Sequence, residues 1–246
     1  MNKLMTLALA SIGMNLLLGC IGDNEKPPID DAMDPAPIVE PTPIEFPRTC
    51  AEASVGHLHL LDGYRTLYVS GDQAKPWPAW CVDMQTKNPA EYLTLPDQQL
   101  NWSQYQSGAA SPGTNVETRF QKVRVDGKTM KVDIGDHRFA TSTGSLKHLG
   151  AGEDVTAMPW GIAMTCDAGN TAVGAISTDG TPFNLANDFE LEGDLLSRDG
   201  HSNIWFTNQT VEFWAHGNCG WIAPKGSGVD PMMNDAGDYL IQLTYQ

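Results

Sequence analysis

The sequence predicts a mainly β fold (α+β with little helix), organised as a single disulfide-bonded, loop-rich domain. Short runs of β-branched and aromatic residues recur between turn residues, and 24 glycines are spread along the 246-residue chain. Five cysteines predict a disulfide framework if the chain leaves the cytoplasm. These observations favour many short strands joined by loops over a helical bundle.

Charge narrows the range of partners. The chain has 15 basic and 30 acidic side chains, which gives a formal net charge of −15. Phosphate binding needs clustered Lys and Arg, so we expect no nucleic acid as a main partner.

The first 19 residues are typical of a signal peptide, with a short positive start at Lys3 and a mostly apolar stretch after it. Leu17-Leu18-Gly19-Cys20 resembles a bacterial lipobox, in which the cysteine thiol carries a diacylglycerol. Cys20 is therefore the predicted lipidation site, and an ordinary signal peptide cut elsewhere is the alternative. Ile21 replaces the Asp that favours inner-membrane retention in enteric bacteria. We therefore expect a lipid anchor in the bacterial cell envelope, at the outer membrane.

Residues 20–48 are predicted to be the lipidated cysteine and a tether. Residues 21–48 hold seven of the 16 prolines and seven acids, against only Lys26 and Arg48. Such a composition buries little apolar surface and favours an extended linker of roughly 85 Å. In the alternative interpretation, Ile38, Val39, Ile44 and Phe46 dock on the domain as an arm.

Residues 49–246 are predicted to form one domain, since no second linker divides them. Asp126-Gly127 predicts a hairpin with a type I′ turn. Only residues 185–196 have a helical spacing of apolar residues. The predicted strands are 67–70, 79–84, 91–95, 119–125, 131–134, 172–177, 204–207, 211–214 and 239–244.

With Cys20 lipidated, an even number of cysteines remains, which indicates two disulfides outside the cytoplasm. They are Cys50, Cys81, Cys166 and Cys219. Three pairings are open. A zinc site would need a close pair such as Cys-x-x-Cys, and the sequence has none.

A series of short motifs runs in order along residues 50–220. It opens with Cys50, Asp62-Gly63-Tyr64 and Trp80-Cys81-Val82-Asp83-Met84, and it closes with Gly217-Asn218-Cys219-Gly220. In this order the series resembles the GON domain, the C-terminal ancillary module of ADAMTS-type zinc metalloproteases. The opening also resembles fibrinogen C-terminal domains, in which the first two cysteines pair. The resemblance therefore favours Cys50–Cys81, with Cys166–Cys219 as the second bridge.

The chain departs from this resemblance in two ways. It lacks the extra cysteines of the animal domains, and residues 147–160 and 187–203 look like insertions. The resemblance implies an ancillary module of the extracellular matrix, with metalloendopeptidase activity and zinc implied only by family association. No His-Glu-x-x-His motif is present, so we name no catalytic residue.

Other chemistry has weak candidates only. His57 and His59 would share one face of a strand and could ligate a metal with a third residue, or line an exposed face. A glycosidase would need a carboxylate pair, for which Asp83, Glu91, Asp133 and Asp136 are available. Calcium could bind the acidic segments 194–203 and 230–238, although neither fits an EF-hand loop.

All seven tryptophans lie in residues 49–246. Trp80 and Trp214 stand beside apolar strand residues and are predicted core residues. Trp77 and Trp160 flank prolines and are predicted to be exposed, where they would stack on a sugar or anchor a protein.

We therefore expect an envelope-anchored lipoprotein that displays a non-catalytic module, with the membrane and an extracellular glycan or protein as its partners. No cofactor is expected. The alternatives are a zinc-linked metalloendopeptidase or other hydrolase, and a structural envelope protein without a soluble ligand.

Overall fold

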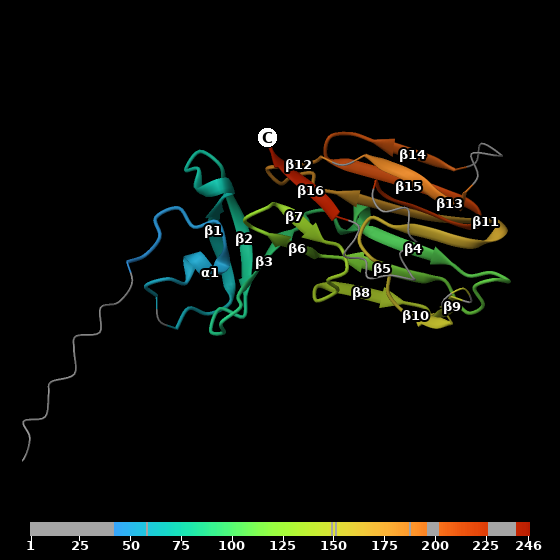
Figure 1. Cartoon of the computed structure of the whole chain (residues 1–246), viewed down its shortest axis with the longest axis horizontal. Coiled ribbons are helices and arrows are strands. Elements are labelled where there is room, and N and C mark those ends of the chain that lie inside the picture. The colour runs from blue at the N-terminus through green and yellow to red at the C-terminus, as the bar shows by residue number, and fades with distance from the viewer. Residues whose placement is uncertain are drawn as a thin grey trace, which may run out of the picture. The chain divides into compact units, whose positions relative to one another are not determined.

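The computed structural model describes residues 42–57, 59–148, 150, 152–186, 188–195, 202–225 and 240–246. The predicted signal peptide, Cys20 and the tether up to residue 41 lie outside these ranges. Of the two acidic segments considered for calcium, residues 196–201 and all of 230–238 also lie outside them. Residues Glu40–Gln246 form one compact unit (Figure 1). Among the described residues, no helix is long and apolar enough to cross a membrane.

Seven strands form sheet A, and each pairs antiparallel with its neighbours. In spatial order they are β1 (Gly63–Tyr68), β2 (Pro76–Val82), β3 (Ala90–Thr94), β6 (Lys122–Asp126), β7 (Lys131–Asp133), β16 (Leu240–Tyr245) and β12 (Phe183–Leu185). The C-terminal strand β16 thus lies inside the sheet, between β7 and β12.

Sheet B is dominated by two long strands, β11 (Ala163–Ser177) and β15 (Thr210–Pro224), which lie side by side (Figure 1). One edge of β15 is shared by β13 (Phe189–Leu195) and β14 (Asn203–Phe206). On the other side of β11 follow β4 (Trp102–Gln106), β5 (Val116–Phe120) and β8 (Ala140–Thr143). A separate pair is formed by β9 (Leu146–His148) and β10 (Glu153–Val155).

Helical structure is limited to short segments in the described part of the chain: α1 (Cys50–Ala53), η1 (Val69–Gly71) and η2 (Gln98–Leu100). The prediction of a mainly β fold with little helix is therefore confirmed.

One buried cluster joins the two sheets. Leu67, Trp77 and Leu93 reach it from sheet A, and Phe120 and Phe213 reach it from sheet B. All five side chains are at most 2% exposed. Strand alternation explains this, because every second residue of a strand faces the same side.

The last residues of the predicted tether lie on the fold. Phe46 packs edge-on against Tyr68, with ring centroids 5.1 Å apart, and the Tyr68 amide donates to the Pro47 carbonyl at 2.8 Å. Ile44 remains 42% exposed. The docked-arm interpretation thus holds for residues 46–48, while Ile38 and Val39 lie outside the described residues.

The helix predicted at residues 185–196 is wrong. Residues 189–192 alternate Phe, Glu, Leu and Glu, which is the period of a strand, and they pair with β15. Gly193 has φ +70°, and an added Cβ would lie 2.6 Å from the Cys219 carbonyl oxygen. The close approach of β13 to β15 therefore depends on this glycine.

The single strand predicted at residues 119–125 is two strands in different sheets. The break falls at Gln121, whose amide donates to the Phe139 carbonyl and whose carbonyl accepts from the Leu95 amide, both at 2.9 Å. These two backbone hydrogen bonds take the place of regular strand pairing at Gln121, where the chain leaves β5 of sheet B and enters β6 of sheet A.

The hairpin predicted at Asp126-Gly127 exists, but its type I′ turn does not. Asp126 pairs with Lys131, which leaves residues 127–130 as the loop, and the positive φ of 58° falls on Met130. The Asp126 carboxylate accepts from the amides of Lys128 and Thr129 at 2.8 and 3.1 Å. This Asx-type capping stabilises the longer loop.

A fully buried amide, Asn101, connects the start of β4 to β11 and to the segment before it. Its Oδ1 accepts from Trp160 Nε1 at 3.1 Å and from the Ser177 amide at 2.9 Å. Its Nδ2 donates to the carbonyls of Asp97 and Ser177 at 2.6 and 3.0 Å. The side-chain amide thus uses all four of its hydrogen-bonding positions.

We predict that Asn101→Ala lowers the free energy of unfolding by about 3 kcal/mol, because it leaves buried donors without acceptors. Urea unfolding measures the effect. Asn88→Ala, at an exposed loop position, should change stability by less than about 0.5 kcal/mol. Equal losses in the two variants would contradict the role of Asn101.

Candidate functional site

One of the two expected disulfides is present. Cys50 and Cys81 are bonded, with their Cα atoms 5.6 Å apart, so α1 is tied to β2. Thr49 caps α1 by accepting from the Glu52 amide at 3.1 Å. The pairing that the family resemblance favours is confirmed.

The expected Cys166–Cys219 disulfide does not form in the structure. Thr165 pairs with Gly220 and Asp167 with Gly217, so the register shifts between β11 and β15 at this point. Cys219 takes a left-handed φ of 49° and is exposed, whereas Cys166 is 1% exposed and its sulfur accepts from the Tyr105 hydroxyl at 3.1 Å. At this irregularity one cysteine is buried and the other is exposed, and the two are not bonded.

The two histidines proposed as weak metal candidates do not share a strand face. His57 and His59 lie in the turn region after α1, and His59 has a left-handed φ of 68°. Within the described ranges, no group of three or more His, Cys, Asp or Glu side chains could hold a metal ion.

The four carboxylates considered for hydrolysis make contacts within the protein. Asp83 forms a bidentate ion pair with Arg138, which lowers the pKa of Asp83. Asp136 accepts from the Tyr92 hydroxyl at 2.8 Å. Burial, together with this hydrogen bond to Asp136, raises the pKa of Tyr92. These contacts hold the loops at one end of sheet A.

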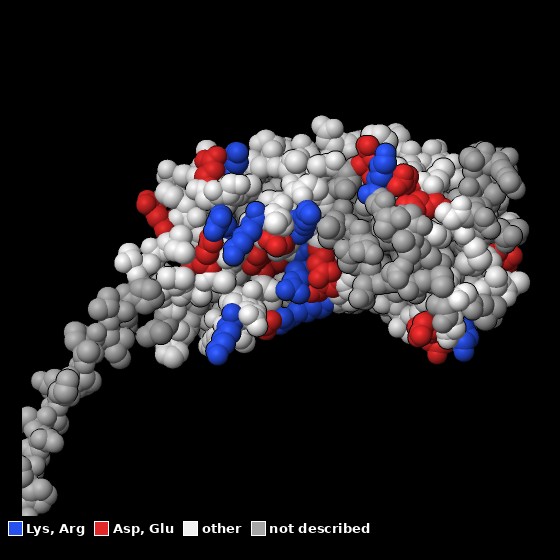
Figure 2. All heavy atoms as spheres, in the orientation of Figure 1, with Lys and Arg blue, Asp and Glu red and all other residues white. Residues whose placement is uncertain are grey.

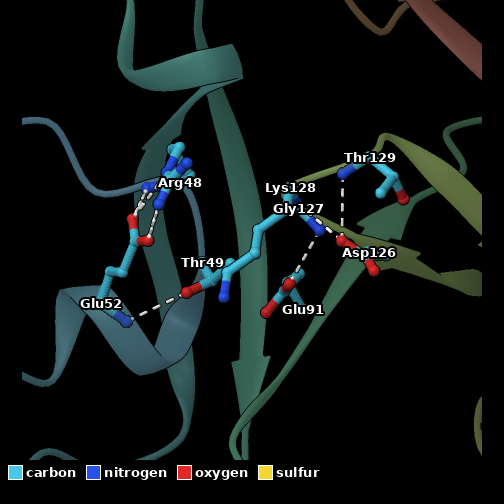
Figure 3. A network of polar contacts seen from close by, with 8 residues as sticks. All are labelled: Arg48, Thr49, Glu52, Glu91, Asp126, Gly127, Lys128 and Thr129. Carbon is cyan, nitrogen blue, oxygen red and sulfur yellow. Dashed lines mark hydrogen bonds and ion pairs between the residues drawn. The ribbon is translucent and has the colours of Figure 1, made fainter.

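Glu91 is the one buried carboxylate of that set, at 7% exposure. One oxygen accepts from the Gly127 amide at 2.9 Å (Figure 3), and the other accepts from the Cys50 amide at 3.1 Å. Burial raises the pKa of Glu91, and the two amide bonds oppose that shift. The arrangement joins α1, β3 and the β6–β7 hairpin.

A cavity of about 640 Å³ opens beside this network. Its walls include Thr49, the hairpin residues Lys128 and Lys131, Arg124 of β6 and Glu91. Figure 2 shows basic and acidic side chains gathered over the region where α1, β6 and β7 lie in Figure 1. This volume falls within the range of small-molecule sites.

Two tryptophans predicted to be exposed are buried, and one predicted to be in the core is exposed. Trp77 is 1% exposed and Trp160 is fully buried. Trp77 packs edge-on against Phe183 at 5.5 Å, and Trp160 donates to Asn101. Trp214, predicted to be in the core, is 37% exposed, and Trp80 is half-buried on the outer side of sheet A.

Three tryptophans on one side of sheet B define what we call the tryptophan face: the exposed Trp205 and Trp214 and the half-buried Trp102. Trp205 is 62% exposed. Trp205 pairs with Glu212, so Trp205 and Trp214 are diagonal neighbours on one side of the sheet. Ala175 pairs with both Glu212 and Trp102, which places Trp102 in the same row.

Polar groups surround the tryptophan face. The Arg119 guanidinium lies 5.4 Å from the Trp102 ring centroid, and Arg119 also donates to Glu117 at 2.7 Å. Thr171 of β11 and His216 of β15 are paired and hydrogen-bonded at 2.9 Å, and His216 lies two residues after Trp214 on the same side of β15. Flat aromatic rings beside fixed donors and acceptors form a surface suited to ligand contact.

The sequence did not reveal most residues of the cavity or of the tryptophan face. Trp205 and Lys131 lie in predicted strands, where alternation alone could have marked them as outward-facing. Lys128 and Lys131 also stand close together in a strongly acidic chain, which is a usable signal. The partners across each sheet come from distant segments and have no local signal.

Residues 47–115 match the family model of the GON domain. This GON segment begins just before α1 and includes β1 to β4, the Cys50–Cys81 disulfide and Glu91. The resemblance is thus confirmed for this part of the chain, while the later motifs up to residue 220 lie outside the match. No curated protein and no solved structure matches the chain.

We predict that the contribution of Glu91 to the free energy of unfolding depends on pH. Its raised pKa means that the folded state prefers the protonated carboxyl, and the resulting stability is complete below the ordinary value of 4.5. That stability is lost as pH rises through the folded-state pKa. The difference in free energy of unfolding between the parent protein and Glu91→Gln should therefore fall over this window and then level off.

Urea unfolding over a pH series that starts below 4.5 tests this expectation. Glu153→Gln on β10, where Glu153 is exposed, is the matched control and should give no comparable pH-dependent difference. A difference for Glu91→Gln that stays flat across the series would show that burial does not perturb this carboxyl.

Proposed function

We propose that this protein is a lipid-anchored envelope protein that displays a non-catalytic recognition module for an extracellular glycan or protein. The observation that carries the proposal is the tryptophan face on sheet B. Large, flat aromatic side chains that remain in water on a rigid sheet favour a surface that a ligand covers.

A glycan is the better of the two ligand classes for this face. Trp205 and Trp214 are diagonal neighbours at about 7–8 Å, so adjacent sugar rings of one chain could each meet an indole. Glu212 and Asn203, which pair across the strands with Trp205 and Trp214, add polar groups beside the rings. Sugar hydroxyls need such partners, while the apolar faces of the sugar rings stack on the aromatic ones.

The anchor is proposed from the N-terminal sequence. The lipobox-like motif ends at Cys20, and a proline- and acid-rich segment separates it from the folded unit. Acyl chains on Cys20 would hold the protein on a membrane, since each buried CH2 contributes about 0.8 kcal/mol. Ile21 favours the outer membrane as its destination.

We predict that Trp205→Ala combined with Trp214→Ala weakens glycan binding by about tenfold or more, because both stacking surfaces are removed. A glycan array identifies the ligand, and calorimetry with the parent and variant proteins measures the change. The fold should persist, since both side chains are substantially exposed.

Tyr64→Ala is the matched control, because Tyr64 is a 53% exposed aromatic residue on sheet A. It should leave the same affinity unchanged within a factor of about two. An array without any bound glycan, or equal weakening by the Tyr64 variant, would reject the tryptophan face as the binding surface.

We also predict that Cys20→Ser abolishes lipidation and releases the protein from the membrane fraction. Globomycin, which inhibits the lipoprotein signal peptidase, should make the unprocessed precursor of the parent protein accumulate. Mass spectrometry of the mature N-terminus provides the direct measurement. Unchanged processing in globomycin would refute the lipid anchor without bearing on the tryptophan face.

A further inference from the structure

We propose that the cavity beside α1 binds an acidic saccharide, whose carboxylate or sulfate group is held by Lys128 and Lys131. The inference goes beyond the proposed function, because this cavity lies on sheet A and the hairpin, whereas the tryptophan face lies on sheet B. Acidic and basic side chains line the cavity in equal number, and the inference rests on a difference in their contacts, because the acids accept hydrogen bonds within the protein whereas the two lysines form no ion pair with a described residue.

The acids of the cavity already have donors. Glu91 accepts two backbone amides, from Cys50 and Gly127. Asp126 accepts the amides of Lys128 and Thr129. Asp133 accepts the Gly135 amide at 3.2 Å and lies 3.9 Å from Arg124. These hydrogen bonds spread the carboxylate charge onto fixed donors inside the protein.

The lysines of the cavity have no such partner. Neither Lys128 nor Lys131 forms an ion pair with a described residue, although Lys131 stands opposite Asp126 across the hairpin. Both side chains are exposed at the cavity wall. Both ammonium groups are therefore free to pair with an anion that enters the cavity.

Lys128 is placed to close over a ligand. Figure 3 shows its side chain reaching from the hairpin toward Thr49 and α1. The neighbouring Glu52 is already paired with Arg48, whose side chain donates hydrogen bonds to both oxygens of Glu52. The hydrogen bond from Arg48 lowers the pKa of Glu52, with a smaller contribution from Lys128. Lys128 thus remains available at the mouth of the cavity.

The backbone around the cavity argues for a saccharide over a peptide. β3 lies between β2 and β6, β6 lies between β3 and β7, and β7 lies between β6 and β16. No free strand edge is therefore presented there for an extended peptide to pair with. Hydroxyls of Thr49 and Thr129 and the apolar surfaces of Ala51 and Pro89 line the walls instead, which suits a ring with hydroxyls and apolar faces.

The net charge of −15 does not prevent this binding. Charges farther away than about 8 Å are largely screened at physiological salt. A ligand in the cavity therefore responds mainly to the local groups, which are Arg124, the two lysines, and the three carboxylates that already accept hydrogen bonds within the protein. Binding should weaken as salt is raised.

The test is calorimetric titration of the complete folded protein with four probes: tetragalacturonate, a heparin tetrasaccharide, chitotetraose and tetraglutamate. The first two separate carboxylate from sulfate recognition, the third is neutral, and the fourth is an acidic peptide. We expect at least one acidic saccharide to bind, and Lys128→Gln combined with Lys131→Gln to weaken it by about tenfold or more.

Lys147→Gln combined with Lys225→Gln is the matched control, because it removes the same charge at exposed positions away from the cavity. This control and the Trp205 and Trp214 double variant should each keep the affinity within a factor of about two. The proposal is overturned if neither acidic saccharide binds, if tetraglutamate binds equally well, or if the control loses as much affinity. Loss in the tryptophan variant alone would assign acidic saccharides to the tryptophan face.

Discussion

Two hydrogen bonds to one buried carboxylate hold together the part of the molecule around the cavity. Glu91 on β3 accepts the amide at the start of α1 and the amide of Gly127 in the β6–β7 hairpin. Gly127 is needed there, because an added Cβ would lie 2.2 Å from the Arg48 carbonyl oxygen. Glu91 therefore links the cavity wall on α1 directly to the wall on the hairpin, in addition to the Cys50–Cys81 disulfide that ties α1 to β2.

The sequence predicted the positions of strands better than it predicted which side chains of those strands are exposed. Alternation within 204–207 and 211–214 identified β14 and β15, because a half-buried strand repeats every two residues. It did not show which side of the strand is covered. Trp214 follows the inward Phe213 and so faces outward, whereas Trp77 faces Phe183, which lies far along the chain. Such contacts depend on how the sheets pack.

Local irregularities account for the other wrong predictions. A shift in register and a left-handed residue separate Cys166 from Cys219, and a capping carboxylate selects a longer loop after Asp126. Neither feature has a strong sequence pattern, since both depend on what the neighbouring strand offers. The disulfide at Cys50 was accessible only through the family resemblance, and the match over residues 47–115 supports the same region.

The position of the Cys50–Cys81 bond has a mechanical consequence. It joins the chain, at the point where it begins to fold, to β2, which is hydrogen-bonded to β1 on one side and to β3 on the other. Tension applied to the residues before Cys50 therefore passes through a covalent bond into an interior strand of sheet A. The one-turn helix α1 and the loop after it are spared that force. Force applied from the N-terminal side must therefore break the β1–β2 and β2–β3 hydrogen bonds together before the domain unfolds.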